Sequence, residues 1–397
     1  MEKLAIFGGT PVRETPIAYG KQCVEQDDID AVVETLRSDF ITCGPKVDAL
    51  EEKLCEVTGA RYAVVVSNGT AALHLAALAA GFGEGDEVIV SSVTFAASSN
   101  CVLYCGAKPV FADIRPDTYN IDPESIEKLI TPRTKGIVAV DFTGQAVEHD
   151  AIREICKKHN LILIEDAAHA IGTKYKGRPV GSIADMTCFS FHPVKTVTSG
   201  EGGAITTNDE QLYHRLMRLR THGITRNPEE MVHPTDALWY NEQVELGYNY
   251  RMTEFQAALL LSQLKKLPKF SARRKEIVEK YDKAFSEMPE IFVQREIPES
   301  DTTRHLYILR LNLDKLTCDR RQFFDALYAE NTRPQVHYLP VYWHSYYEKL
   351  GYQKGICPNA EKYYEEVMSI PLYYSLTDAD TDDVIRAVKK VVEYYRK

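Results

Sequence analysis

The sequence lacks a long uninterrupted hydrophobic run and has no block of basic residues. No apolar stretch approaches the ~18 residues of a membrane-spanning helix, so we expect no membrane association. The formal net charge of -10 and the scattered cations argue against nucleic-acid binding, which depends on clustered lysines and arginines. The N-terminal stretch reaches Gly8 and Gly9 too soon for a secretory signal peptide. We therefore expect a cytoplasmic protein.

Paired cysteines and the common nucleotide-binding glycine motifs are missing as well. The nine cysteines form no CxxC motif, and no second Cys/His pair accompanies Cys101 and Cys105, which are one helical turn apart. Reduced buried thiols are therefore favoured, and we expect no metal site. The sequence contains GEGG from Gly200 but no GxGxxG and no GxxxxGK[ST]. These absences argue against a nicotinamide-dependent or nucleotide-fuelled enzyme.

Short apolar segments alternate with helical patterns between residues 62 and 208. The apolar segments are YAVVVS from Tyr62, EVIVS from Glu87, PVFAD from Pro109, GIVAVDF from Gly136, LILIED from Leu161, MTCFSF from Met186 and GAITTN from Gly203. Because each contains a short continuous run rich in apolar and β-branched residues and lies near a helical pattern, the strands should be covered on both faces. The sequence predicts an α/β fold with a mainly parallel sheet flanked by helices.

The character of the sequence changes after Asn208. Long charged helical patterns follow, with Pro268 between two of them, and the last third is rich in tyrosine. A strand-like segment at 305–313 and helix-like segments at 320–330 and 382–395 indicate a smaller α+β domain. We predict a large domain over residues 1–267, including the N-terminal segment, and a small C-terminal domain over 268–397. The segment 228–251 is expected to be a long loop, a common place for function.

One lysine stands in unusual surroundings, in the stretch SFHPVKTVTSGEGG at residues 190–203. Lys195 follows a proline and precedes three glycines, which we expect to leave room for a ligand. Asp166 ends the apolar segment LILIED, and ligands of open α/β sheets gather at that edge. An aspartate in this position can equally cap a helix. His169, three residues later, has an equally open role, because a lone histidine near a core is commonly structural.

A third feature is SNGTAAL, which follows a predicted strand and begins a helix. Gly69 allows close approach of a ligand to the backbone, and Thr70 offers a hydroxyl where free N–H groups and the helix dipole favour a phosphate. Plain capping of the helix by Asn68 or Thr70 explains the same residues.

Together these features fit the needs of pyridoxal phosphate (PLP). A lysine forms a Schiff base with its aldehyde, and an aspartate keeps its pyridine nitrogen protonated, so that the ring acts as an electron sink. Such a charge-assisted hydrogen bond contributes roughly 1.5–3 kcal/mol. Phe95, at the start of a predicted helix, could stack on the ring, although a phenylalanine taken alone is more often a core residue.

Six motifs in order make the sequence resemble the DegT-type nucleotide-sugar aminotransferases, which are PLP enzymes of the aspartate-aminotransferase fold, fold type I. These motifs are SNGTAAL, GDEVIVSSVTF, GAKPVFADIRPDTYNID, IEDAAHAIG, SFHPVKTVTSGEGGAI and GYNYRMTEFQAAL. The resemblance implies that Lys195 forms the Schiff base and moves the proton, and that Asp166 pairs with the pyridinium nitrogen. It implies that His169 lies beside the phenolic oxygen and that Phe95 stacks on the ring. It also implies that the phosphate is held by Gly69, Thr70 and Ser190, and that Asn249 reaches the phosphate of the neighbouring subunit. It thereby implies a homodimer with shared active sites.

The C-terminal half is similar to the C4 aminotransferases of pseudaminic acid biosynthesis. That resemblance implies L-glutamate as the amino donor and, as the acceptor, a UDP-linked 4-keto-6-deoxy-N-acetyl-hexosamine of the altro configuration. His337 and Tyr338 match a segment that lines the sugar site in this group, and Arg251 is expected to approach an anionic group. Tyrosines that merely pack the small domain explain the same segment.

Three other functions stay open at this point. Spore-coat polysaccharide aminotransferases share much of the pattern, which leaves the sugar open. Some relatives carry histidine in place of the lysine and act as dehydratases, a function that Lys195 argues against. A non-catalytic regulatory protein could also keep the fold.

Overall fold

The computed structural model describes residues 2–233, 235 and 237–397 of the chain. Its centre is a seven-stranded sheet in the order β1-β9-β8-β5-β4-β2-β3. β9 is antiparallel to both of its neighbours, whereas the other pairs are parallel. The predicted mainly parallel sheet and its seven strands are therefore confirmed. The strands are β1 (Tyr62–Val66), β2 (Glu87–Ser91), β3 (Lys108–Ala112), β4 (Thr134–Val140), β5 (Ile162–Asp166), β8 (Met186–Ser190) and β9 (Gly203–Thr207).

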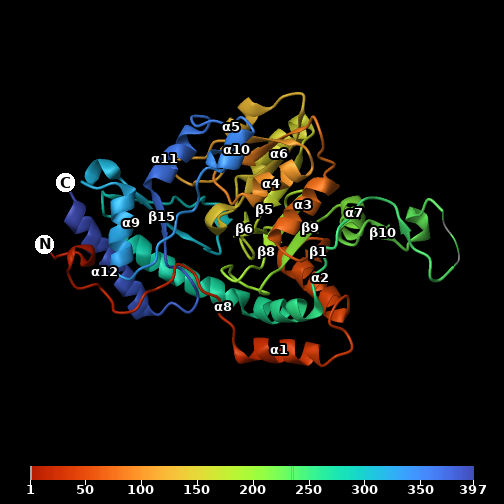
Figure 1. Cartoon of the computed structure of the whole chain (residues 1–397), viewed down its shortest axis with the longest axis horizontal. Helices are drawn as coiled ribbons and strands as arrows, with labels where there is room; N and C mark the ends of the chain where they lie inside the picture. The colour runs from red at the N-terminus through yellow and green to blue at the C-terminus, as the bar shows by residue number, and fades with distance from the viewer. Residues whose placement is uncertain (1, 234, 236) are drawn as a thin grey trace.

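Helices lie on both faces of this sheet (Figure 1). Alternate residues of a strand point to opposite faces, so Val64 packs in one apolar cluster and its neighbour Val65 in another. One cluster includes the apolar residues of α3, and the other those of α2 and α8. The helices of this part are α2 (Pro45–Thr58), α3 (Gly69–Ala79), α4 (Ala97–Tyr104), α5 (Pro123–Leu129), α6 (His149–His159) and α7 (Glu210–Arg220).

A second, three-stranded antiparallel sheet in the order β12-β14-β15 lies in the C-terminal part. Apolar residues of one face of this sheet, such as Leu309 and Met368, pack with α9 and α12 in a separate cluster, whereas Ile308 and Val367 pack in the cluster that contains α3. The strand and helices expected near 305–313, 320–330 and 382–395 are confirmed. The elements are β12 (Ile291–Val293), β14 (Tyr307–Leu311), β15 (Val367–Ile370), α9 (Arg320–Ala329), α10 (Ser345–Lys349), α11 (Pro358–Glu366) and α12 (Asp378–Tyr395).

The long helix α8 (Glu254–Phe285) joins these two parts and runs through the lower part of the molecule in Figure 1, above α1. The sequence places Pro268 between two helical patterns, but the helix continues through it. Leu264 packs with the central sheet and Ile277 with the C-terminal cluster, so burial along one stripe offsets the ~3 kcal/mol that an internal proline costs.

The division into residues 1–267 and 268–397 stays a prediction. Two observations bear on it: α8 crosses the proposed boundary, and the N-terminal residues Leu4 and Ile17 pack in the C-terminal cluster. The N-terminal segment is therefore joined by packing to the C-terminal part of the chain.

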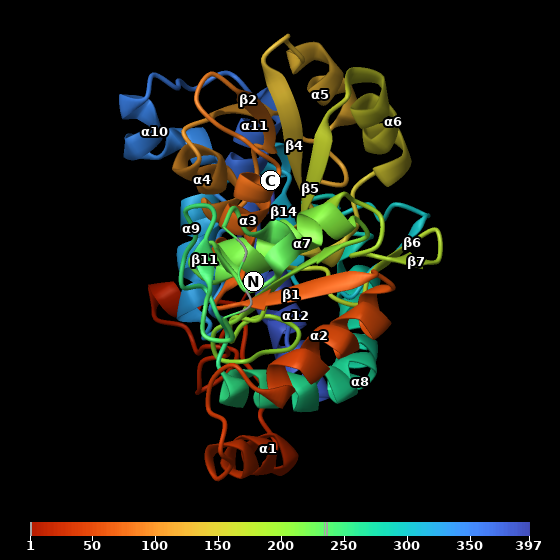
Figure 2. The ribbon, with the colours of Figure 1, turned by 90° about the vertical axis from the view of Figure 1, so that its right-hand side faces the viewer.

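The remaining elements are short, apart from α1 (Gln26–Leu36), which packs outside α8 (Figure 2). The expected loop at 228–251 contains η3 and β11, which pairs with β10, while its residues 234 and 236 lie outside the described residues. Among the described residues, no helix is both long enough and apolar enough to cross a membrane. The short elements are β6 (Lys174–Tyr175), β7 (Arg178–Pro179), β10 (Ile224–Thr225), β11 (Glu242–Gln243), β13 (Ser300–Asp301), η1 (Ala5–Phe7), η2 (Phe142–Gly144), η3 (Pro228–Glu230), η4 (Leu313–Lys315) and η5 (Val341–Trp343).

Candidate active site

A cavity of about 930 Å³ lies where β2, β4, β5 and β8 end. Ligands of open α/β sheets bind at this edge. Asn249 and Arg251 are not among the described residues that line it, although Tyr250 between them is. The predicted site residues that line the cavity are Gly69, Thr70, Phe95, Asp166, His169, Ser190, Lys195, His337 and Tyr338.

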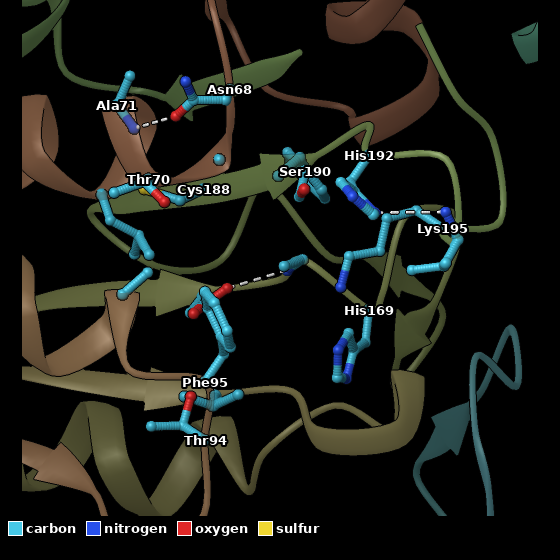
Figure 3. A pocket seen from close by; sticks show the side chains of 18 of the residues that line it. Asn68, Thr70, Ala71, Thr94, Phe95, His169, Cys188, Ser190, His192 and Lys195 are labelled. Atoms are coloured by element: carbon cyan, nitrogen blue, oxygen red, sulfur yellow. Dashed lines mark hydrogen bonds between the residues drawn. The ribbon is translucent and has the colours of Figure 1, made fainter. Parts of the chain in front are cut away.

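Lys195 lies in the turn that follows β8, where its N–H donates to the carbonyl of His192 at 2.9 Å. Figure 3 shows its side chain extending into the cavity, in the direction of His169. Burial lowers the pKa of the Lys195 amine to about 8, and the attraction of the Asp166 carboxylate acts in the opposite direction. A lysine of lowered pKa is more often neutral at physiological pH, as a nucleophile must be.

Asp166 is the last residue of β5 and is buried at the floor of the cavity. Its Oδ1 accepts the N–H of Ala168 at 3.1 Å, and its Oδ2 accepts the Ser98 hydroxyl at 2.5 Å. Burial raises the pKa of the Asp166 carboxyl, while these two donors and the Lys195 charge act against that rise. A turn follows β5, so the alternative of a helix cap is wrong.

The start of α3 faces the same cavity. Asn68 accepts the N–H of Ala71 at 2.8 Å and is the cap of this helix, as one of the two explanations expected. Gly69 and Thr70 still line the cavity, and the first N–H groups of a helix have no partner within it. A Cβ on Gly69 would lie 2.8 Å from the Cβ of Ser190, so only glycine permits this approach of α3 to β8. These three residues fit the cradle expected for a phosphate.

The sequence predicts that the glycines after Lys195 leave room for a ligand, and for Gly202 and Gly203 this prediction is wrong. A Cβ on Gly203 would lie 2.4 Å from the carbonyl oxygen of Asn68, and one on Gly202 would meet the side chains of Ser199 and Met252. Both glycines therefore make room for the protein itself, and Gly203 allows β9 to pass close to the start of α3.

Three buried histidines surround the Lys195 end of the cavity. The rings of His169 and His305 lie 4.4 Å apart, and the Tyr338 hydroxyl lies 3.5 Å from Nε2 of His169. Burial lowers the pKa of His169 and of His305 well below the ordinary range, and that of His337 to about 4. All three are therefore neutral at physiological pH, and Nδ1 of His169 has no hydrogen-bond partner among the described residues. A buried ring nitrogen without a partner fits a site that a polar ligand atom completes.

Phe95 precedes α4 and is 61% exposed, so the alternative of a core phenylalanine is wrong. Its ring lines the cavity, with its centroid 6.3 Å from that of Tyr338. An exposed aromatic face at the cavity fits the stacking partner of a flat ligand ring. His337 also lines the cavity, where its Nδ1 lies 2.8 Å from the Ser369 hydroxyl.

Sequence reasoning missed several residues of this site. Tyr19 comes from the N-terminal segment and lines the cavity beside His337, with their rings 5.4 Å apart. His305 reaches His169 from the C-terminal part, and no local pattern indicates it. Ser98 had a detectable signal, because it lies four residues after Thr94 at the beginning of a helix that follows a buried strand.

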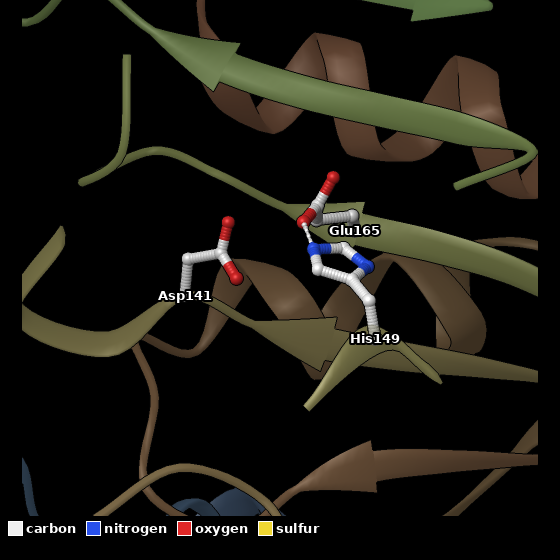
Figure 4. Close-up of side chains that lie close together, drawn as sticks. All are labelled: Asp141, His149 and Glu165. Atoms are coloured by element: carbon white, nitrogen blue, oxygen red, sulfur yellow. Dashed lines mark ion pairs between the residues drawn. The ribbon is translucent and has the colours of Figure 1, made fainter. Parts of the chain in front are cut away.

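A second buried cluster, on the far side of β5, joins Asp141, His149 and Glu165 (Figure 4). His149 Nε2 lies 2.7 Å from Glu165 Oε1, whereas two ligands of one tetrahedral zinc would be about 3.4 Å apart. Burial and the Glu165 charge raise the pKa of the Asp141 carboxyl well above its ordinary range, which favours its protonated form. We interpret the cluster as a network of shared protons, and the expected absence of a metal site stays a prediction.

The cysteines in the described part of the chain are all free thiols. Cys101 and Cys156 are buried, as is Cys188, which also lines the cavity, whereas Cys43 is exposed. Reduced thiols are what the sequence predicts.

Each part of the cavity matches one part of a single cofactor. The amine of Lys195, the carboxylate of Asp166 and the cradle at Gly69 fit the aldehyde, the pyridine nitrogen and the phosphate of PLP. Fold and site together define a PLP-dependent aminotransferase. Residues 22–389 match the DegT/DnrJ/EryC1/StrS aminotransferase family, and the chain belongs to that family.

Two relatives of the chain have names that indicate different functions. The spore coat polysaccharide biosynthesis protein SpsC of Bacillus subtilis is 41% identical over 379 residues, covering 95% of this chain and 97% of that protein. A UDP-4-amino-4,6-dideoxy-N-acetyl-beta-L-altrosamine transaminase of Campylobacter jejuni is 39% identical over 385 residues, covering 96% of this chain and 99% of that protein.

Two solved structures are similar over nearly the whole chain. PseC of Helicobacter pylori, an aminotransferase involved in the biosynthesis of pseudoaminic acid, has a TM-score of 0.89 and 33% identity over 96% of this chain and 100% of its own. The PLP form of the sugar aminotransferase Spr1654 of Streptococcus pneumoniae has a TM-score of 0.88 and 33% identity over 96% of this chain and 99% of its own. The resemblance seen in the sequence is confirmed: this is a sugar aminotransferase whose cofactor is PLP.

Proposed function

We propose that the protein transfers the amino group of L-glutamate to C4 of a UDP-linked 4-keto-6-deoxy-N-acetyl-hexosamine. The product would be UDP-4-amino-4,6-dideoxy-N-acetyl-beta-L-altrosamine. The names of the Campylobacter jejuni transaminase and of Helicobacter pylori PseC support this substrate. The observation that carries the proposal is the Lys195 amine of lowered pKa, which reaches into the cavity where Asp166 lies.

Lys195 would bind the cofactor aldehyde at rest and move a proton at Nζ during transfer. An amine with a pKa of about 8 can both accept and return a proton near neutral pH. Bound PLP supplies an electron sink that stabilises negative charge on the carbon that loses this proton. Asp166 would hold a proton on the pyridine nitrogen, and neutral His169 would offer its Nδ1 to the phenolic oxygen without adding charge beside Lys195.

The same cavity must accept glutamate and a bulky nucleotide sugar in turn. Aromatic side chains suit the apolar face of a sugar ring, and Tyr19 and Tyr338 line the cavity beside His337. We infer that this side holds the keto sugar. Arg251 would bind an anionic group of a substrate at the margin, since it is adjacent to Tyr250, which lines the cavity.

A homodimer with shared sites follows from the family resemblance, and the exposed apolar residues of α1 support it. α1 buries Asp28 against Lys266 of α8 at 2.8 Å and leaves its apolar residues outside. Ile29 is 47% exposed and Leu36 is 54% exposed. Such a face needs a partner, and we infer a second copy of the chain. Exposed Asn249 would then reach the phosphate cradle of that copy.

Three alternatives to this proposal can be distinguished from it by experiment. SpsC supports another nucleotide-sugar aminotransferase of spore-coat or surface-polysaccharide synthesis, which would use a different keto sugar. A PLP sugar dehydratase or a non-catalytic regulatory protein of the same fold would leave no role for a lysine that transfers protons. The cytoplasmic location expected from the sequence stays a prediction.

The test is to follow the two half-reactions by the absorbance of the bound cofactor. L-glutamate should bleach the visible band of the holoenzyme, and one member of a panel of UDP-keto sugars should restore it. If the altro-configured 4-keto-6-deoxy sugar restores the absorbance band, the proposed substrate is supported. If only a different sugar restores the band, the spore-coat alternative is supported. An enzyme that neither glutamate nor any keto sugar changes contradicts an aminotransferase role.

A further inference from the structure

The Asp166 carboxylate is held by a pair of buried hydroxyls from another element. Ser98 Oγ lies 2.5 Å from Asp166 Oδ2, and Thr94 Oγ1 lies 2.6 Å from Ser98 Oγ. Ser98 is fully buried on α4, and Thr94 is 2% exposed just before this helix. Neither serves to cap the helix, because Ala96 occupies that position.

The direction of these hydrogen bonds follows from the number of protons. Ser98 has one hydroxyl proton, and the carbonyl oxygen of Phe95 is farther away, at 3.3 Å, than the carboxylate. An ionised carboxylate only accepts hydrogen bonds, so Ser98 donates to Asp166. The oxygen of Ser98 is then free to accept, and Thr94 donates to it. In such a chain each hydrogen bond polarises the next.

We propose that Ser98, aligned by Thr94, is a positioning residue that fixes the orientation and the charge of the Asp166 carboxylate. The backbone N–H of Ala168 holds the other carboxylate oxygen at 3.1 Å, so the plane of the group is set from both sides. The inference rests on the proposed contact between Asp166 and the pyridine nitrogen.

The contact between Ser98 and Asp166 affects the proton that the Asp166 carboxylate and the pyridine nitrogen of the cofactor would share. Asp166 is buried, and burial favours its neutral form, in which it could not hold a proton on a ring nitrogen. A hydroxyl donor stabilises the ionised carboxylate and makes it a weaker base. The shared proton then stays on the nitrogen. Without Ser98, the proton should move toward Asp166.

The chain offers a matched control on the same helix. Ser99 is also fully buried on α4, but its hydroxyl forms a hydrogen bond of 2.8 Å with that of Tyr347, whereas the hydroxyl bonded to Asp166 is that of Ser98. Ser99→Ala therefore removes an equivalent hydroxyl and leaves the carboxylate unchanged. Ser98→Thr keeps the hydroxyl at the proposed position.

The experiment is 15N magnetic resonance of the holoenzyme reconstituted with PLP labelled at the pyridine nitrogen, without substrate. In Ser98→Ala the ratio of protonated to unprotonated nitrogen should fall about tenfold, the effect of losing one hydrogen bond to a charged group. Thr94→Val should shift the signal in the same direction by less. Ser98→Thr should restore the wild-type signal, and Ser99→Ala should not change it.

Two results would overturn the inference. A wild-type signal in Ser98→Ala, with a changed signal in Asp166→Asn, would show that the carboxylate needs no support from Ser98. Equal changes in Ser98→Ala and Ser99→Ala would show that α4 acts only through packing. If Ser98→Ala does not fold, the 15N signal of Thr94→Val is used in its place, and a wild-type signal in that variant would overturn the inference. An unchanged signal in Asp166→Asn would refute the proposed role of Asp166 itself, which is a different failure.

Discussion

The lowered pKa of Lys195 can be measured in the protein freed of its cofactor. With a pKa of about 8, roughly one amine in ten is neutral at pH 7, against roughly one in 3,000 for a lysine at the ordinary value of 10.5. The reactivity of Lys195 toward a small acylating reagent at pH 7 should therefore exceed that of an ordinary lysine by a factor of ~300, apart from differences in access. The rate should rise about tenfold per pH unit and level off near pH 8.

The assay is brief acylation over a range of pH, followed by mass spectrometry of the peptide that contains Lys195. Lys176 is a control in the same sample, because its contact with Asp150 raises the pKa of its amine. Asp166→Asn removes the negative charge that favours the ammonium form, so the midpoint for Lys195 should fall below that of the wild type. A midpoint near pH 10.5 in the wild type, or a higher midpoint in Asp166→Asn, would refute the reasoning.

Three further predictions test the proposed roles. Asp166→Asn should lose more in the rate of amino transfer than in PLP affinity, measured by steady-state kinetics and cofactor titration; weak binding with full turnover at saturating PLP would indicate a purely structural residue. Mixing inactive Lys195→Ala with Asn249→Ala should regenerate activity in heterodimers, and no gain beyond the two separate activities would contradict shared sites. His337→Ala should slow the keto-sugar half-reaction and spare the glutamate half-reaction in stopped-flow measurements, whereas equal damage would assign His337 to the fold or cofactor site.

The central sheet could be predicted because its signal is local. Segments such as LILIED begin with a continuous run of leucine and isoleucine, and packing on both faces of a strand favours such a run. Asp166 was identified for the same reason, since it ends a strand of this kind, and Lys195 was identified by the proline and glycines around it in the turn after β8. Pro268 shows the limit of local rules, because the buried stripe of α8 extends across it and outweighs its helix-breaking tendency.

The missed residues depend on contacts between distant parts of the chain. His305 reaches His169, and Tyr19 reaches His337, across long sequence separations that no local pattern encodes. The glycine at position 203 was identified but explained wrongly, because its neighbour is Asn68 and not a ligand. A pattern indicates that a glycine is needed, whereas only the fold identifies the atoms that need the space.

The most direct test of the proposed reaction is to follow the nitrogen atom. The enzyme would be incubated with 15N-labelled L-glutamate and the altro-configured UDP-4-keto-6-deoxy-N-acetyl-hexosamine, and the nucleotide sugar analysed by mass spectrometry. The account predicts a UDP-4-amino sugar that carries 15N, with Lys195→Ala as the inactive control. A nucleotide sugar that has lost water, or one without 15N while glutamate is still consumed, would contradict the account.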